Sequence, residues 1–263
     1  AEHHHREDTN IMSILGSLTP AKGLRVLITA GAGGIGQAIA RGFVETGARV
    51  HISDIDEATV SAATGGAITG SVANAADEAQ TKALFEEARE QMGGLDVVIA
   101  NAGVAGPTSR VGEISQADWD ECLEINLRGA YLAARFGEAE LKANKGLFIA
   151  MASVAGRLPY AFRTPYAASK WGVIGLAKSL ATEMGPDGVR ANAILPGIVK
   201  GPRIDKVIQA RADQVGVSFE EMREQYLAKV SLRRMVTAED IAAMCLFLAS
   251  PGGSNVSGQA LSV

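Results

Sequence analysis

Short apolar runs alternate with longer segments of mixed polarity along most of the chain. The apolar runs have few interruptions, which is typical of strands buried on both faces of a parallel sheet. The predicted strands are 24–29, 49–53, 67–72, 95–100, 146–152, 189–195 and 258–263, and the predicted helices are 34–45, 77–91, about 116–136, about 166–184 and 237–249. This alternation predicts an α/β fold, in which right-handed crossovers favour a Rossmann-like, doubly wound parallel sheet of about seven strands with helices on both faces.

The chain has neither a Pro/Ser-rich linker nor a sequence repeat, so we expect one domain over residues 21–263. Residues 1–20 form an N-terminal leader in this interpretation. His3, His4 and His5 resemble the remains of an affinity tag, and part of the leader is expected to be disordered. The segment 197–236 is too long for an ordinary connection between a strand and a helix, and we expect it to form a lid over a substrate site.

Composition excludes several classes of function. Hydrophobic residues make up 47% and charged residues 21% of the chain, as in a globular protein with a substantial core, and the net charge of −4 gives no general case for nucleic-acid or membrane binding. No apolar run reaches the roughly 18 residues of a membrane-spanning helix. Cys122 and Cys245 are far apart, which suits buried structural roles in a reducing, cytoplasmic compartment. Outside the leader only His51 remains, so no metal site is predicted.

A glycine-rich turn connects the first predicted strand to the first predicted helix. Residues 29–36 read TAGAGGIG, which places Gly31, Gly33 and Gly36 in a G-x-G-x-x-G pattern. Glycines let the backbone approach a pyrophosphate, and the start of a helix offers free N–H groups and a positive dipole. The turn therefore predicts a dinucleotide site, with a tight turn that binds no ligand as the alternative.

An acidic residue follows the second predicted strand. Asp54 can accept hydrogen bonds from the adenosine ribose hydroxyls and repel a 2′-phosphate. No arginine or lysine lies in the glycine turn or directly after Asp54, and this balance favours NAD over NADP. Asp56 is a second candidate for the same role. The alternative for Asp54 is that it is a solvent-exposed loop residue with no role in cofactor binding.

Tyr166 and Lys170 lie one helical turn apart, downstream of Ser153. A nicotinamide enzyme that oxidises an alcohol needs a group to take the hydroxyl proton while hydride leaves. A tyrosine can do this near neutral pH when a nearby ammonium stabilises its phenolate, and a lysine at i+4 lies on the same helix face.

Taken in order, these motifs resemble the classical short-chain dehydrogenase/reductase family from about residue 23 to residue 263. The family's ordered set is a glycine turn, N-A-G after the fourth strand, an Asn in the next helix, a Ser after the fifth strand, Y-x-x-x-K, and P-G after the sixth strand. In this chain the set reads 29–36, Asn101-Ala102-Gly103, Asn126, Ser153, Tyr166/Lys170 and Pro196-Gly197.

The resemblance implies a role for each of these positions. Tyr166 would be the general acid/base, Lys170 would stabilise its phenolate and hold the nicotinamide ribose, Ser153 would bind the substrate oxygen, and Asn126 would hold a water linking Lys170 to solvent. The alternative is that Asn126 and Asn101 only make hydrogen bonds to the backbone of a helix or a turn. The implied cofactor-binding residues are Gly31, Gly33, Gly34, Ile35, Gly36, Asp54, Val72, Asn101, Gly103, Tyr166, Lys170, Pro196, Gly197 and Val199.

Three positions depart from the family pattern. Ala30 replaces the first glycine, which we expect to be tolerated only if Ala30 keeps a negative φ. Ser71-Val72 occupies a position where the family commonly has Asp-Val, so a carboxylate contact to adenine is in doubt. Gly201 replaces the usual Thr, so a side-chain contact to the cofactor is lost there.

Two basic segments flank the predicted catalytic residues. Arg157, Arg163 or Arg203 could bind an anionic group of the substrate, such as a carboxylate. The alternative is a solvated helix face with ion pairs to Glu220, Glu221 or Glu224. Tyr160 and Phe162 could line the pocket or pack at a subunit interface.

The sequence thus predicts an NAD-dependent oxidoreductase that interconverts a secondary alcohol and a ketone without a metal. A small polar hydroxy compound, such as a sugar acid or polyol, is the preferred substrate class. A 3-ketoacyl-type or other ketone reductase is the first alternative, and a catalytically silent nucleotide-binding protein is the second. The resemblance further implies a homotetramer.

Overall fold

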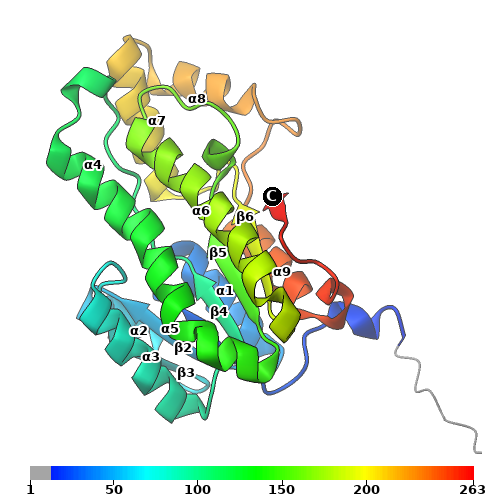
Figure 1. Ribbon diagram of the computed structural model, residues 1–263. Helices are drawn as coiled ribbons and strands as arrows, with labels where there is room; N and C mark the ends of the chain where they lie inside the picture. Colours follow the sequence, from blue (N-terminus) through cyan, green and yellow to red (C-terminus); the bar gives the residue numbers. More distant parts are fainter. Residues whose placement is uncertain (1–12) are drawn as a thin grey trace, which may run out of the picture.

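The computed structural model describes residues 13–263, so the predicted tag at His3–His5 lies outside the described residues. Seven parallel strands form one sheet in the order β3-β2-β1-β4-β5-β6-β7 (Figure 1). The strands are β1 (Arg25–Ile28), β2 (Arg49–Asp54), β3 (Ile68–Val72), β4 (Val97–Ala100), β5 (Leu147–Met151), β6 (Arg190–Leu195) and β7 (Ala260–Ser262). The order reverses between β1 and β4, which confirms the doubly wound topology predicted from the apolar runs.

Helices cover both faces of the sheet. They are α1 (Gly34–Glu45), α2 (Glu57–Ala63), α3 (Glu78–Met92), α4 (Gln116–Leu123), α5 (Gly129–Asn144), α6 (Thr164–Met184), α7 (Pro202–Val215), α8 (Phe219–Leu227) and α9 (Ala238–Ala249). Successive strand residues point to opposite faces, so Leu27 packs with α3, α5 and α6 while its neighbours Val26 and Ile28 pack with α1 and α9. Two apolar cores therefore hold the sheet from both sides.

The sequence prediction missed the short helix α2 and misplaced the end of the helix expected over about 116–136. Asp56 is the N-cap of α2 and accepts a hydrogen bond from the Thr59 N–H at 2.7 Å. The helix predicted to end near 136 continues to Asn144, after a π-helical turn, η3 (Glu124–Arg128), that joins α4 to α5. Its later residues remain helical because Leu141 is buried in the core.

The segment 197–236, which is expected to form a lid, contains α7 and α8. Ile208, Ala212 and Met222 form a small apolar core of their own between these helices. Both ends of the segment are held together: the Lys200 N–H donates to the Val236 carbonyl, and the Val236 N–H donates to the Ile198 carbonyl. In Figure 1, α7 and α8 lie together at one end of the molecule, beyond the start of α6 and far from α2 and α3.

Candidate active site

The glycine turn between β1 and α1 combines two crowded glycines with two open ones. A Cβ on Gly31 would lie 2.7 Å from Ile52 Cγ2, and one on Gly36 would lie 2.8 Å from Asn101 Nδ2, so neither position has room for a side chain. Added Cβ atoms on Gly33 and Gly34 would meet nothing within 4 Å. Among the residues that the structure describes, none caps the start of α1 with its side chain. Open space over uncapped N–H groups fits a pyrophosphate.

Ala30 contradicts the expectation of a negative φ, because its φ is 49°. A left-handed alanine costs roughly 1–2 kcal/mol, so the surrounding structure must hold it. Asn101 does so, since its Nδ2 donates to the Thr29 carbonyl at 3.1 Å and to the Ala30 carbonyl at 2.9 Å. The Asn101 N–H donates to Thr29 Oγ1 in turn. Asn101 therefore joins the end of β4 to the glycine turn.

Asp54 and Asp56, the two candidates for binding the adenosine ribose, differ in their surroundings. Asp56 caps α2, and its hydrogen bonds with Thr59 lower its pKa. Asp54 ends β2 and pairs in register with Val72 at the end of β3. Among residues 13–263, its carboxylate accepts only the N–H of the next residue, Ile55, at 2.8 Å. Asp54 is therefore the acid that remains available at this edge of the sheet, and Val72 presents an exposed apolar surface beside it.

Tyr166 and Lys170 lie in the first two turns of α6, on the face that packs against the end of β5. The Lys170 side chain is 3% exposed, and its Nζ donates to the Met151 carbonyl at 2.8 Å and lies 5.7 Å from the centre of the Tyr166 ring. Burial, followed by the positive charge of Arg203, lowers the pKa of Lys170 to about 7. Ser153 follows β5, is buried, and accepts the Ala155 N–H at 3.2 Å.

Asn126 lies within the π-helical turn and faces the same site. Its Oδ1 accepts the Val104 N–H at 2.7 Å, and its Nδ2 donates to Ser169 Oγ at 3.0 Å and to the Val104 carbonyl. These bonds occupy both amide hydrogens. π-Turns are frequent at functional sites because they disrupt the regular backbone hydrogen bonding of a helix. Ser169 is a partner that the sequence prediction missed.

Gly103 fills the narrow space between Asn126 and Lys170. A Cβ on Gly103 would lie 3.0 Å from Asn126 Oδ1 and 3.4 Å from Lys170 Nζ. A larger residue would push these two side chains apart. The glycine of the N-A-G motif is thus explained by a close approach at the site itself.

The residues after β6 line the same edge of the sheet. The Gly197 N–H donates to the Val263 carbonyl at 2.9 Å, and the Pro196 carbonyl accepts the Val154 N–H from the loop after Ser153. Val199 forms an isolated bridge with Val236 at the base of the α7–α8 segment. Gly201, the departure from Thr, has a φ of 151° and precedes α7, a conformation that favours glycine.

The three predicted substrate arginines occupy different places. Arg157 is exposed and donates to the Ala260 carbonyl of β7 at 2.7 Å. Arg203, in the first turn of α7, donates to the Gly103 carbonyl at 3.1 Å. Arg163 is 3% exposed, donates to the Ala105 carbonyl, and lies 4.9 Å from the centre of the Tyr166 ring. The fold brings Arg163 and Arg203 to the loop beside Lys170 and holds Arg157 against the last strand.

The aromatic residues before α6 contact the α7–α8 segment within this chain. Tyr160 hydrogen-bonds Tyr226 of α8 through the two hydroxyls at 3.0 Å, and burial raises the pKa of Tyr160. The Arg211 guanidinium of α7 lies 3.8 Å from the centre of the Phe162 ring. The sequence prediction named Tyr160 and Phe162 but missed these partners.

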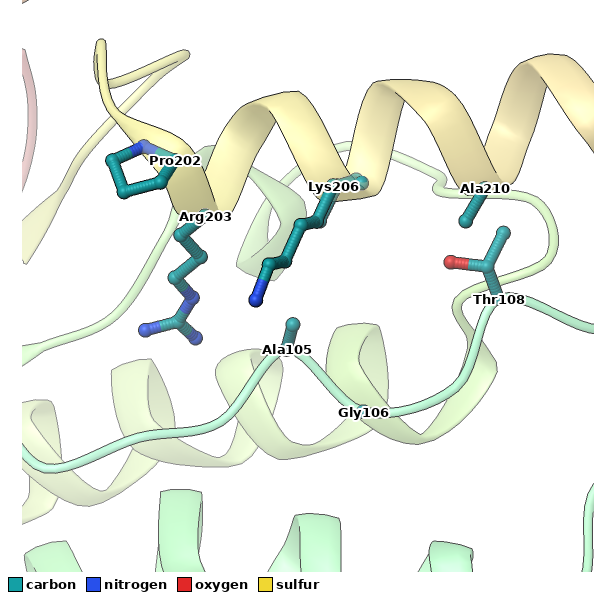
Figure 2. Close-up of a pocket in the computed structure, with 8 residues that line it drawn as sticks. Ala105, Gly106, Thr108, Pro202, Arg203, Lys206 and Ala210 are labelled. Carbon is teal, nitrogen blue, oxygen red and sulfur yellow. The ribbon is translucent and has the colours of Figure 1, made fainter.

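A cavity of about 450 Å³ lies between α7 and the loop after β4. Its lining residues are Ala105, Gly106, Thr108, Pro202, Arg203, Lys206, Val207 and Ala210. Figure 2 shows the side chains of Arg203 and Lys206 extending from α7 toward this loop. Within residues 13–263, the salt bridges include none between these basic residues and Glu220, Glu221 or Glu224, so the alternative of ion pairs with these glutamates is not supported.

Residues 13–263 contain no helix long and apolar enough to cross a bilayer, and no cluster of three or more His, Cys, Asp or Glu side chains suited to a metal ion.

Comparisons with known proteins identify relatives in sequence and in fold. A family model described as enoyl-(acyl carrier protein) reductase matches residues 30–263. The chain is 34% identical to (+)-borneol dehydrogenase 1 of Salvia officinalis, over 90% of both chains. It superposes with a TM-score of 0.82 on the 3-ketoacyl-(acyl-carrier-protein) reductase from Brucella melitensis complexed with NADH, at 26% identity over 92% of this chain and 97% of the other. It also superposes with a TM-score of 0.85 on a single-residue variant of actinorhodin polyketide ketoreductase with NADPH, at 29% identity over 92% of this chain and 95% of the other.

Proposed function

The chain belongs to the classical short-chain dehydrogenase/reductase family, whose members are oxidoreductases that use a nicotinamide cofactor, and we propose that it is an NAD-dependent dehydrogenase interconverting a secondary alcohol and a ketone. The observation that carries this proposal is the meeting of Tyr166, Lys170, Ser153 and Asn126 at the carboxyl edge of the sheet, beside the glycine turn. A small polar hydroxy compound is the proposed substrate class.

Each side chain has a defined part in the proposed reaction. The bound nicotinamide ring would accept or supply the hydride. In the oxidation direction Tyr166 takes the hydroxyl proton of the substrate, and Ser153 hydrogen-bonds the same oxygen as its charge changes. Lys170 in its protonated, positively charged form stabilises the Tyr166 phenolate. With a pKa of about 7, Lys170 can also pass a proton onward, which supports a relay toward Asn126.

Tyr166→Phe tests this assignment directly. The variant should bind NADH as the wild type does, whereas kcat should fall by roughly 10²–10⁴-fold because the general acid/base is removed. Stopped-flow turnover and fluorescence titration measure the two quantities. Tyr131→Phe, on the exposed face of α5, is the matched control and should leave both unchanged. Wild-type turnover in Tyr166→Phe would contradict the proposed mechanism.

The preference for NAD rests on Asp54. A carboxylate at the end of β2 attracts the ribose hydroxyls and repels a 2′-phosphate, and no basic residue lies between 29 and 36 or in the five residues after Asp54. Tryptophan-quenching titrations should give a lower Kd for NADH than for NADPH. Asp54→Asn should narrow this difference, whereas Asp56→Asn, which keeps the cap of α2, should not. Tighter binding of NADPH by the wild type would refute the assignment.

A ketoreductase acting on acyl-carrier-linked substrates is the second candidate. It is favoured by the structural similarity to the Brucella melitensis and actinorhodin reductases named above. NADPH-dependent reduction of an acetoacetyl thioester, faster than NADH-dependent reduction of any free ketone, would select it. A catalytically silent nucleotide-binding protein is disfavoured by the complete set of catalytic side chains.

The proposed assembly is a homotetramer located in the cytoplasm. Trp171 on α6 is about half exposed, as a large apolar side chain is when a partner subunit would cover it. Light scattering of the purified protein would give the mass of the assembly.

A further inference from the structure

We propose that the cavity between α7 and the loop after β4 binds an anionic group of the substrate, and that Lys206, together with Arg203, holds a carboxylate there. The substrate would accordingly be a keto acid and its hydroxy acid. This inference rests on the proposed function and deepens it, because it assigns the chemical class of the molecule on which Tyr166 acts.

The charges at the start of α7 are the reverse of what helix stability favours. The N-terminus of a helix carries a partial positive charge, so acidic side chains stabilise the first turn and basic ones destabilise it. Arg203 and Lys206 lie within the first five residues of α7, with Lys200 just before the helix and Asp205 as the only nearby acid on it. Within residues 13–263, neither Arg203 nor Lys206 forms a salt bridge. An anion in the cavity would relieve this repulsion.

The lining of the cavity fits a short carbon chain with a charged end. Ala105, Val207 and Ala210 supply apolar surface, Arg203 and Lys206 supply positive charge, and none of the lining residues is acidic. Figure 2 shows the two basic side chains entering from the same helix face, on the side of the cavity opposite Ala105. Arginine and lysine both make charge-assisted hydrogen bonds to carboxylates, and the planar guanidinium matches the two carboxylate oxygens.

Hydrogen bonds and close packing connect the lining of the cavity to the catalytic residues. Arg203 donates to the Gly103 carbonyl, and Gly103 is wedged between Asn126 and Lys170. Ala105, which lines the cavity, accepts a hydrogen bond from Arg163, whose guanidinium lies against the Tyr166 ring. An anion held at Lys206 would thus leave the rest of a small substrate pointing toward Tyr166.

Matched keto acids and methyl esters test the inference, because esterification removes the charge and keeps the ketone. The panel is 2-oxobutanoate, 3-oxobutanoate and 4-oxopentanoate with their methyl esters, each reduced with NADH. Wild type should show a lower KM for at least one acid than for its ester. In Lys206→Met the KM for that acid should rise about 10- to 100-fold, as expected for loss of a charged hydrogen bond, while the ester is unaffected. Lys200→Met, from the same basic stretch but outside the cavity lining, should leave both KM values unchanged.

Inhibition by a small carboxylate distinguishes failure of the carboxylate site from failure of the proposed function. Sodium acetate should inhibit ester reduction competitively in the wild type and lose this effect in Lys206→Met. Equal KM values for acids and esters, or stronger inhibition by inorganic phosphate than by acetate, would overturn the carboxylate site while leaving the dehydrogenase intact. Absence of NADH binding and of turnover on every acid and ester would instead refute the proposed function itself.

Discussion

At the scale of single residues, Tyr166 is flanked by two buried cations. Lys170 lies one turn further along α6, and Arg163 immediately precedes the helix, with its guanidinium 4.9 Å from the Tyr166 ring centre and 5.3 Å from that of Tyr160. Arg163 Nε is buried and has no hydrogen-bond partner within 13–263, and the same guanidinium donates to the Ala105 carbonyl. The guanidinium is packed on the Tyr166 ring and bonded to the backbone, so Arg163 suits a positioning role beside Tyr166 better than direct contact with substrate.

Arg163→Met should therefore lower kcat more than it raises KM. Without the guanidinium the Tyr166 ring loses a contact that holds its orientation, and kcat should fall roughly 10-fold, as expected for loss of a desolvated cation–π contact. Arg163→Lys should restore part of the difference, and Arg157→Met, on the loop held to β7, is the control. Steady-state kinetics with NAD and the alcohol substrate provides the measurement. An unchanged kcat with a higher KM would return Arg163 to the substrate role that the sequence suggested.

At the scale of elements, the glycine turn assigns different tasks to its glycines. Gly36 is crowded by Asn101 and by the Gly31 backbone, whereas Gly33 is exposed, has a φ of −144°, and faces open space. Gly36→Ala should destabilise the protein by about 1–3 kcal/mol through overpacking, lowering Tm in a thermal melt. Gly33→Ala should keep the wild-type Tm and weaken NADH binding, because its methyl group enters the space meant for the pyrophosphate. Equal Tm losses in both variants would contradict this division.

Some of these elements could be predicted from the sequence, and others could not. The strands and α1 followed from apolar runs and glycine positions because those patterns reflect burial directly. The helix α7 could also have been predicted from the sequence. Its apolar residues Ile204, Ile208 and Ala212 recur at four-residue spacing, and Pro202 and Gly216 suit its two ends. The π-helical turn at Asn126 could not have been predicted, because it depends on the Val104 backbone and Ser169, which only the tertiary fold brings near. The positive φ of Ala30 likewise depends on Asn101, over seventy residues away in the chain.

At the scale of the whole molecule, the segment 197–236 is attached firmly at its base and lightly at its far end. Its two ends are paired through Lys200 and Val236, and its own apolar core is small. Toward the catalytic face it is held by the Tyr160–Tyr226 hydrogen bond, the Arg203 bond to Gly103 and the stacking of Arg211 on Phe162. A segment with few buried contacts opens at a lower free energy than the sheet, which is the behaviour expected of a lid.

Tyr226→Phe removes one of these three attachments without changing the shape of the side chain. Burial raises the pKa of Tyr160, so its hydroxyl stays protonated and able to donate, and in the variant it faces a ring edge instead of an oxygen. Loss of this bond should increase opening of 197–236 about 2- to 10-fold, in line with the ~0.5–1.5 kcal/mol of a neutral hydrogen bond. Hydrogen exchange of α8 amides should accelerate accordingly, while amides of β4 and β5 keep their wild-type rates. Tyr131→Phe provides the control, and unchanged exchange in α8 would show that the segment is held by its base alone.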